Sequence, residues 1–142
     1  MALNVLVVDD SATMRKIIIK TLMMSGLPLG ELYEAGNGAE GLEVIDNNWI
    51  DLALVDINMP VMTGEEMIDK LRHNPDTADI PVIVVSTESS TARIDMLQHD
   101  GVGFVHKPFT PERLRETVLA MIGDGGNGKS GERTIQLSDN SL

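Results

Sequence analysis

The sequence predicts an α/β fold in which helices cover both faces of a parallel sheet. Short hydrophobic runs alternate along the chain with longer stretches whose apolar residues recur at helical spacing. The central runs, Leu52–Val55 and Val82–Val85, consist mostly of β-branched residues and leucine. Continuous apolar strands of this kind occur where both faces of a sheet are buried.

Four of the predicted strands are short apolar runs: Val5–Val8, Leu52–Val55, Val82–Val85 and Val102–Val105. A fifth, around Leu32 and Tyr33, is shorter and more polar, which suits the edge of a sheet.

Five helices are predicted from apolar residues three or four positions apart. Their expected buried faces are, in chain order, Met14, Ile17, Ile18 and Leu22; Leu42, Ile45 and Trp49; Met67, Ile68 and Leu71; Ile94 and Leu97; and Leu114, Val118, Met121 and Ile122. The fourth helix, expected within Ser89–His99, has the weakest apolar stripe.

Local signals mark three helix starts. Asn37 with Glu40, and Thr63 with Glu66, have the spacing of a capping box. The pair Thr110-Pro111 places a capping hydroxyl before a first-turn proline, which predicts the start of the last helix.

Bulk properties exclude several function classes. The 142 residues suit one domain, and the net charge of −11 argues against direct binding to nucleic acid. The absence of cysteine excludes disulfides and thiolate metal sites. No apolar run approaches the roughly 18 residues of a membrane span, and no basic segment precedes the first strand. We therefore expect a cytoplasmic protein that does not insert into membranes.

The composition changes at Gly123, where a glycine-rich stretch begins. Because glycine loses the most backbone entropy on ordering, we expect a domain over residues 1–122 and a flexible tail over residues 123–142. Two interpretations of the tail remain open: a segment without function, or a short docking segment around Thr134–Leu137.

Polar residues follow the predicted strands at their carboxyl ends, where open α/β sheets bind ligands. Asp9-Asp10 and Asp56 follow two strands that, as neighbours, would lie about 4.8 Å apart. Clustered carboxylates call for a cation, and Mg²⁺ takes one or two carboxylates together with a phosphate. Lys107 and Ser86 follow two further strands and suit an anion. The competing interpretations are that Asp10 only caps the next helix, that Lys107 is a solvated surface lysine, and that Ser86 makes a local turn hydrogen bond.

Taken together, these motifs resemble the response-regulator receiver domain of the stand-alone, CheY-like kind. The matching segments are Val7–Arg15, Asp56–Gly64, Ser86 and Lys107–Thr110, and the resemblance covers about Leu3 to Ile122. It implies a flavodoxin-like, doubly wound five-stranded parallel sheet of order 2-1-3-4-5. That order comes from the resemblance and not from the spacing of the runs.

The resemblance also implies the chemistry. Asp56 matches the phosphoacceptor, which takes a phosphoryl group from the phosphohistidine of a sensor histidine kinase. Mg²⁺ is the implied cofactor. Its implied ligands are Asp10, Asp56 and the backbone carbonyl of Asn58, with Asp9 acting through water. Lys107 matches the lysine that neutralises charge on the transferring group. The Lys107–Pro108 peptide is expected to be cis.

Further residues match family positions that act in the conformational switch or that set the lifetime of the phosphoryl group. Ser86 and Phe104 match the hydroxyl and aromatic switch residues, and the best-known chemotaxis regulator has tyrosine where this chain has Phe104. Asn58 and Glu88 match the positions that tune hydrolysis. His106, on the outward side of its strand, is expected to be a surface residue.

The resemblance predicts a single-domain response regulator, not an enzyme, that signals by binding a protein through its fourth helix, fifth strand and fifth helix. A role in chemotaxis or motility is expected. One alternative is a haloacid-dehalogenase-type phosphatase, which needs a second Asp where this chain has Ser11. A flavodoxin-like electron carrier would need a hydroxyl-rich loop after the first strand. A receiver-like module that binds without phosphorylation remains the third alternative.

Overall fold

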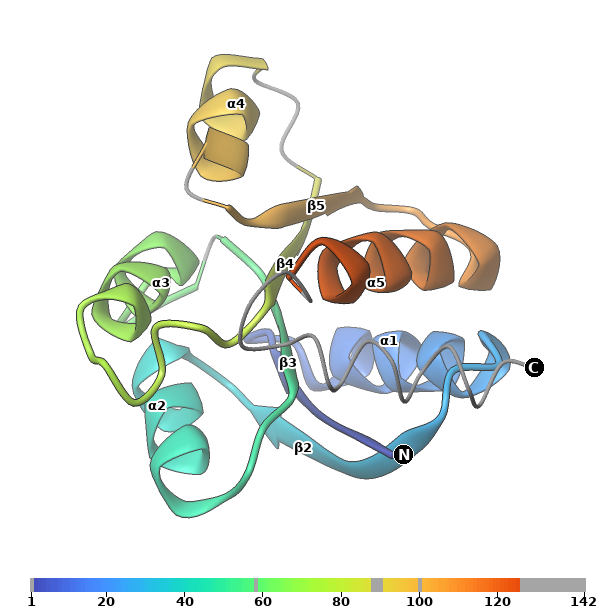
Figure 1. The fold of residues 1–142 in the computed structure, drawn as a ribbon, viewed down its shortest axis with the longest axis horizontal. Coiled ribbons are helices and arrows are strands. Elements are labelled where there is room, and N and C mark those ends of the chain that lie inside the picture. Colours follow the sequence, from blue (N-terminus) through green and yellow to red (C-terminus); the bar gives the residue numbers. More distant parts are fainter. Residues whose placement is uncertain (1, 58, 88–90, 100, 126–142) are drawn as a thin grey trace.

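Five strands and five helices alternate along the part of the chain that the computed structural model describes, residues 2–57, 59–87, 91–99 and 101–125. In chain order they are β1 (Leu3–Val8), α1 (Ala12–Met24), β2 (Leu29–Ala35), α2 (Gly38–Asn47), β3 (Leu52–Val55), α3 (Gly64–Arg72), β4 (Val82–Ser86), α4 (Thr91–His99), β5 (Gly103–His106) and α5 (Pro111–Gly125). The strands form one sheet in the order β2-β1-β3-β4-β5 (Figure 1). This confirms the predicted fold.

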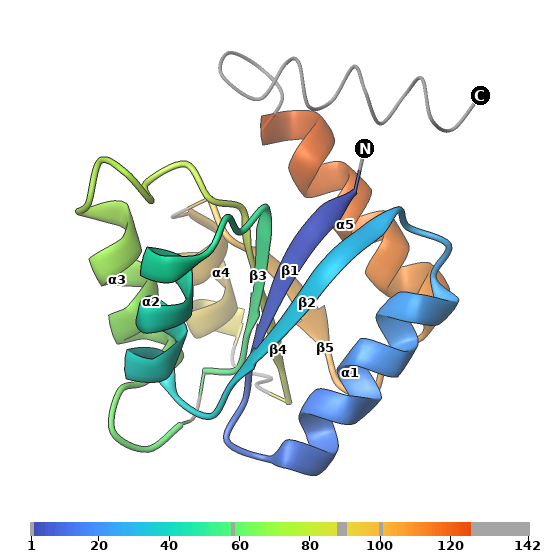
Figure 2. The ribbon, with the colours of Figure 1, turned by 90° about the horizontal axis from the view of Figure 1, so that it is seen from below.

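The helices form a layer on each face of the sheet. Helices α1 and α5 cover one face, and α2, α3 and α4 cover the other (Figure 2). The core on the first face includes Ile18, Leu54 and Leu114, all fully buried. The core on the second includes Leu6 and Met67, also fully buried. Because successive strand residues point to opposite faces, each central strand supplies both layers, and each large side chain contributes about 1.5–3 kcal/mol.

Parallel pairing brings the ends of β1 and β3 to the same edge. Val8, the last residue of β1, pairs with Ala35 on one side and with Val55 on the other. The ladder continues one residue further, because the Asp56 N–H donates to the Val8 carbonyl at 2.9 Å. The Asp9 N–H likewise donates to the Ala35 carbonyl at 3.1 Å. The residues that follow β1 and β3 therefore emerge side by side.

Strand β2 is longer than predicted. It has seven residues, against four in β3, although it lies at the expected edge of the sheet. Polar and small residues such as Gly30 and Glu31 extend it, and both are exposed. An edge strand leaves one side to solvent, so a run with few apolar residues still completes a ladder with its single neighbour.

Two apolar residues predicted in the core are exposed. Ile17 is 48% exposed, while Ile18 and Leu22 fill the buried stripe of α1. Trp49 is 70% exposed, because α2 ends at Asn47 and Asn48 has extended backbone angles. The Trp49 indole Nε1 instead donates to the Asp51 carboxylate at 2.9 Å. The expected burial of Leu97 falls outside the described side chains.

Helix α5 continues to Gly125, three residues past the predicted domain boundary at Ile122. Extending an existing helix adds one hydrogen bond per residue without a new nucleation step, which offsets a cost of about 1 kcal/mol per glycine. Residues 126–142 of the predicted tail lie outside the described residues. Among the described helices, none is long and apolar enough to cross a membrane.

The start of α3 is held by a complete capping box. The Thr63 hydroxyl accepts from the Glu66 N–H at 3.2 Å, and the Glu66 carboxylate accepts from the Thr63 N–H at 3.1 Å. These hydrogen bonds to Thr63 lower the pKa of Glu66 from its ordinary value of 4.5. A lowered pKa means that the cap stabilises the fold above that value and weakens as the pH falls below it. At α2 the predicted box is only half formed, since Glu40 accepts from Gly36 and not from Asn37.

Gly64, the first residue of α3, lies against the backbone of Asp56. Its N–H donates to the Ile57 carbonyl at 2.9 Å. A Cβ at this position would lie 2.2 Å from the Asp56 carbonyl oxygen, far inside van der Waals contact. Only glycine allows α3 to start this close to the end of β3, so the helix and the aspartate are positioned together.

We predict that Gly64→Ala lowers the free energy of unfolding by about 1–3 kcal/mol, since the backbone of α3 or β3 must move to admit the methyl group. Urea denaturation measures the change. Gly36→Ala is the matched control, because its Cβ would meet nothing closer than 3.4 Å. Equal midpoints for the two variants would contradict the argument.

Candidate functional site

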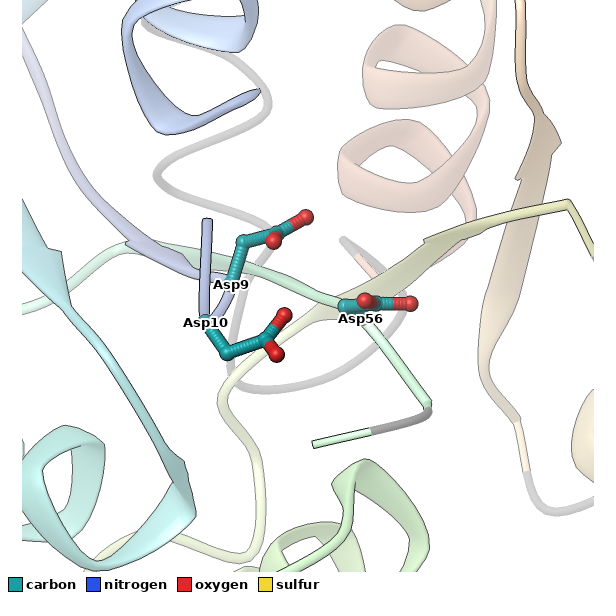
Figure 3. Close-up of side chains that lie close together, drawn as sticks. All are labelled: Asp9, Asp10 and Asp56. Carbon is teal, nitrogen blue, oxygen red and sulfur yellow. The ribbon is translucent and has the colours of Figure 1, made fainter. Parts of the chain in front are cut away.

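Three carboxylates converge at the carboxyl end of the sheet. Asp9 and Asp10 follow β1, and Asp56 follows β3 (Figure 3). One oxygen from each lies within 4.8 Å of the others. The structure therefore brings together the three aspartates that the sequence predicted as metal ligands.

Asp9 is the most enclosed of the three, with 2% of the residue exposed. Its Oδ1 accepts from the Ser11 N–H at 2.9 Å, and its Oδ2 lies 3.1 Å from the Lys107 Nζ. A buried carboxylate requires such partners, because desolvation of an uncompensated charge costs several kcal/mol.

Asp10 does not cap the following helix. The N-cap of α1 is Ser11, whose hydroxyl accepts from the Met14 N–H at 3.1 Å. Asp10 is exposed, and its carboxylate has no hydrogen-bond or ion-pair partner among the described residues. The capping interpretation is wrong, so the side chain is left available for a ligand from solution.

Lys107 reaches the carboxylates from β5, two strands away from β3. Its side chain is 14% exposed, so it is not a solvated surface lysine. Its backbone N–H donates to the Ser86 carbonyl at 2.8 Å, and the Lys107–Pro108 peptide is cis, as expected. In this structure the ammonium pairs with Asp9.

The two predicted switch residues lie on neighbouring strands. Ser86, the last residue of β4, is 1% exposed. Phe104 on β5 pairs with Val84 of β4, and its half-buried ring packs against the core on the α2–α3–α4 face of the sheet. His106 is exposed, as predicted, with its ring centroid 6.4 Å from that of Phe104. Asn58 and Glu88 lie outside the described residues.

The donor set fits a small divalent cation. Carboxylate oxygens are the ligands that Mg²⁺ and Ca²⁺ take, and the three here are close enough to share one ion. One buried and one exposed carboxylate suit Mg²⁺, which keeps several waters and is seldom fully enclosed by protein. The adjacent Lys107 adds a second positive charge, suited to an anion that arrives with the metal.

Comparison with known proteins identifies the chain. The family model for the response regulator receiver domain matches residues 5–119. The chain belongs to the response-regulator receiver family. As a receiver domain it has a phosphorelay role in two-component signalling.

Several chemotaxis proteins are similar to this receiver domain. A CheY homolog of Campylobacter jejuni is 36% identical over 132 residues, covering 92% of this chain and 100% of the relative. CheY1 of Helicobacter pylori is 38% identical over 123 residues, covering 85% and 98%. The crystal structure of CheY4 from Vibrio cholerae superposes with a TM-score of 0.75 at 32% identity, covering 85% of this chain and 99% of that one.

Two residues that contact the site had no role in the sequence interpretation. Gly64 lies directly against the Asp56 backbone, and the guanidinium of Arg15 donates to the Asp9 carbonyl at 2.5 Å. Both lie inside the segments that resemble the family. The available signal for Arg15 was its place early in α1, from which a long side chain points back toward the helix start.

We predict that Lys107→Met lowers the free energy of unfolding by about 3 kcal/mol in buffer with chelator, a typical cost of breaking a buried ion pair. The physical reason is that Asp9 would stay buried beside two further carboxylates without a cation. Urea denaturation gives the value.

The control is a double-mutant cycle with Asp9→Asn. Without the Asp9 charge, Lys107→Met should cost much less. Equal costs in the two backgrounds would show that the pair does not stabilise the fold.

Proposed function

We propose that this receiver domain accepts a phosphoryl group on Asp56 from the phosphohistidine of a sensor histidine kinase, and that it signals by binding a protein partner in the phosphorylated state. The observation that carries the proposal is the Asp56 carboxylate beside Asp9 and Asp10, with Lys107 paired to the same cluster.

The transfer is a nucleophilic displacement. A carboxylate oxygen of Asp56 attacks phosphorus, the P–N bond to the imidazole breaks, and the ring nitrogen leaves with the electron pair. The product is an acyl phosphate. Hydrolysis reverses the state: water attacks phosphorus, the P–O bond to Asp56 breaks, and inorganic phosphate leaves. The protein thus catalyses only its own phosphorylation and dephosphorylation.

Asp10, Asp56 and the Asn58 carbonyl would hold Mg²⁺, with Asp9 supporting it. When bound, the ion supplies the charge that stabilises the transferring phosphoryl oxygens. Lys107 supplies the second charge. Its Nζ lies 3.1 Å from Asp9 in this structure, and a phosphoryl group with a charge of about −2 on Asp56 would compete for it.

Several features support this reading over its alternatives. A dehalogenase-type phosphatase needs a second catalytic Asp at position 11, and Ser11 there is the N-cap of α1. An electron carrier needs a hydroxyl-rich loop after β1, where this chain has Asp9 and Asp10. A receiver that works without phosphorylation has no need for a half-buried lysine beside three carboxylates.

The signal leaves, in this proposal, through α4, β5 and α5. Ser86 turns toward the phosphoryl group, and the half-buried Phe104 ring then moves inward, since burying an aromatic ring is favourable. Helix α4 is expected to move most easily because its sequence has the weakest apolar stripe of the five predicted helices. Its Arg93 binds the Glu65 carboxylate of α3 at 2.5 and 3.2 Å, and both side chains are partly exposed.

Other parts of the proposal rest on the resemblance and the relatives. The similar proteins from Campylobacter and Helicobacter are chemotaxis proteins, which supports a role in chemotaxis. A net charge of −11 argues for a protein partner and not for nucleic acid. A cytoplasmic location, the domain boundary near residue 122, a flexible tail and rapid hydrolysis tuned by Asn58 and Glu88 complete the proposal.

We predict that Asp56→Asn abolishes labelling by acetyl phosphate, because the amide offers no carboxylate nucleophile. Intact-mass spectrometry of protein incubated with Mg²⁺ and acetyl phosphate detects the added phosphoryl group. Asp46→Asn, at an exposed position on α2, is the control and should label as the wild type does. Undiminished labelling of the Asp56 variant would refute the assignment.

We also predict that beryllofluoride, a phosphoryl mimic, changes hydrogen exchange in α4 and β5 more than in α2. The reason is that Ser86 and Phe104 connect the site to that face of the sheet. Asp56→Asn protein treated in the same way should show no change. A change confined to α1 and α2 would mean that the signal leaves by another surface.

A further inference from the structure

Arg15 contacts both the site and the edge of the sheet. It lies in the first turns of α1, and its side chain is 17% exposed. Its Nη1 donates to the Asp9 carbonyl at 2.5 Å, and its Nε donates to the Glu34 carboxylate on β2 at 2.9 Å. The planar guanidinium holds two acceptors in fixed directions, which a lysine cannot do.

The Asp9 carbonyl needs such a donor because the strand ladder ends there. The preceding carbonyl, that of Val8, accepts from the Asp56 N–H, and the Asp9 N–H donates to Ala35. Past this point β1 has no strand neighbour to supply a donor for Asp9. The Arg15 side chain supplies the hydrogen bond that a neighbouring strand would otherwise donate to this carbonyl.

The carbonyl of Asp9 belongs to the peptide that joins Asp9 to Asp10. Because a peptide is planar, fixing that oxygen fixes the N–H of Asp10 and directs its Cα. Asp10 needs this, since its exposed carboxylate has no partner among the described residues. Asp9 differs, because Ser11 and Lys107 hold its carboxylate directly.

We propose that Arg15 is a positioning residue for the metal site: it holds the Asp9–Asp10 peptide and so aims the Asp10 carboxylate at the position that the ion takes. The inference rests on the proposed function, in which Asp10 and Asp56 bind Mg²⁺. Arg15 itself contacts neither the ion nor the phosphoryl group.

The charge of Arg15 and its role in positioning Asp10 predict opposite effects on Mg²⁺ affinity when Arg15 is replaced. The guanidinium beside the Asp9 backbone carries a positive charge that repels a cation, so charge alone predicts tighter Mg²⁺ binding when Arg15 becomes neutral. Loss of the peptide anchor predicts weaker binding, because Asp10 then samples orientations that cannot bind the ion. The sign of the change therefore separates the two roles.

The test compares Arg15→Met with Glu34→Gln in full-length protein. The dissociation constant of Mg²⁺ is measured from backbone amide NMR shifts. Arg15→Met should weaken binding about tenfold, the lower end of the usual effect of removing a group that supports a ligand. Glu34→Gln removes only the ion pair at the sheet edge and keeps the Asp9 contact, so its effect should stay within about twofold.

A second measurement, on metal-free protein, is independent of metal binding. Amide exchange of Asp10 and Ser11 should be faster in Arg15→Met than in the wild type and unchanged in Glu34→Gln. If Arg15→Met does not fold, Arg15→Lys replaces it in the test. Lysine keeps the positive charge but lacks the planar guanidinium, so this variant should also bind Mg²⁺ more weakly than the wild type.

The outcomes distinguish this inference from the proposed function. Unchanged or tighter binding in Arg15→Met, or wild-type affinity in Arg15→Lys, would overturn the positioning role. Absence of Mg²⁺ shifts at Asp9, Asp10 and Asp56 in the wild type would instead overturn the proposed metal site. In that case metal-free exchange still decides whether Arg15 holds the peptide, and equal rates would refute it.

Discussion

Mutual repulsion of three carboxylates within 4.8 Å is the constraint to which the surrounding structure responds. Each follows the end of a strand, so the sheet fixes the place of its backbone. Lys107 supplies one cation from the end of β5, and the Ser11 N–H donates to the Asp9 carboxylate. Carboxylate oxygens this close together suit a divalent cation at this edge of the sheet.

The strands could be predicted from short-range patterns in the sequence, whereas the strand order that places Asp9 and Asp10 beside Asp56 came from the family resemblance. Apolar runs such as Val5–Val8 define strands, and the residue after each run must lie at the same edge. The alternating pattern says less about edge elements. Polar residues lengthen β2 because one side of an edge strand meets water, and Trp49 is exposed because α2 ends before reaching it.

Contacts between distant segments were the part that the sequence could not supply. The pairing of Lys107 with Asp9, 98 positions apart, depends on how a flexible side chain crosses two strands. The close approach of Gly64 to Asp56 depends on where α3 begins in space. That approach joins the start of α3 to Asp56, while Arg93 and Glu65 join α3 to α4.

Trp49 has a practical consequence for spectroscopy. It is the single tryptophan of the chain, and it precedes β3, whereas Asp56 follows β3. At about 3.3 Å per strand residue, the length of the strand separates the indole from the carboxylates. Its intrinsic emission comes from an indole in water whose N–H is tied to Asp51. Quenching by a metal ion or a phosphoryl group requires an indole close to the carboxylates, and Trp49 lies beyond the opposite end of β3.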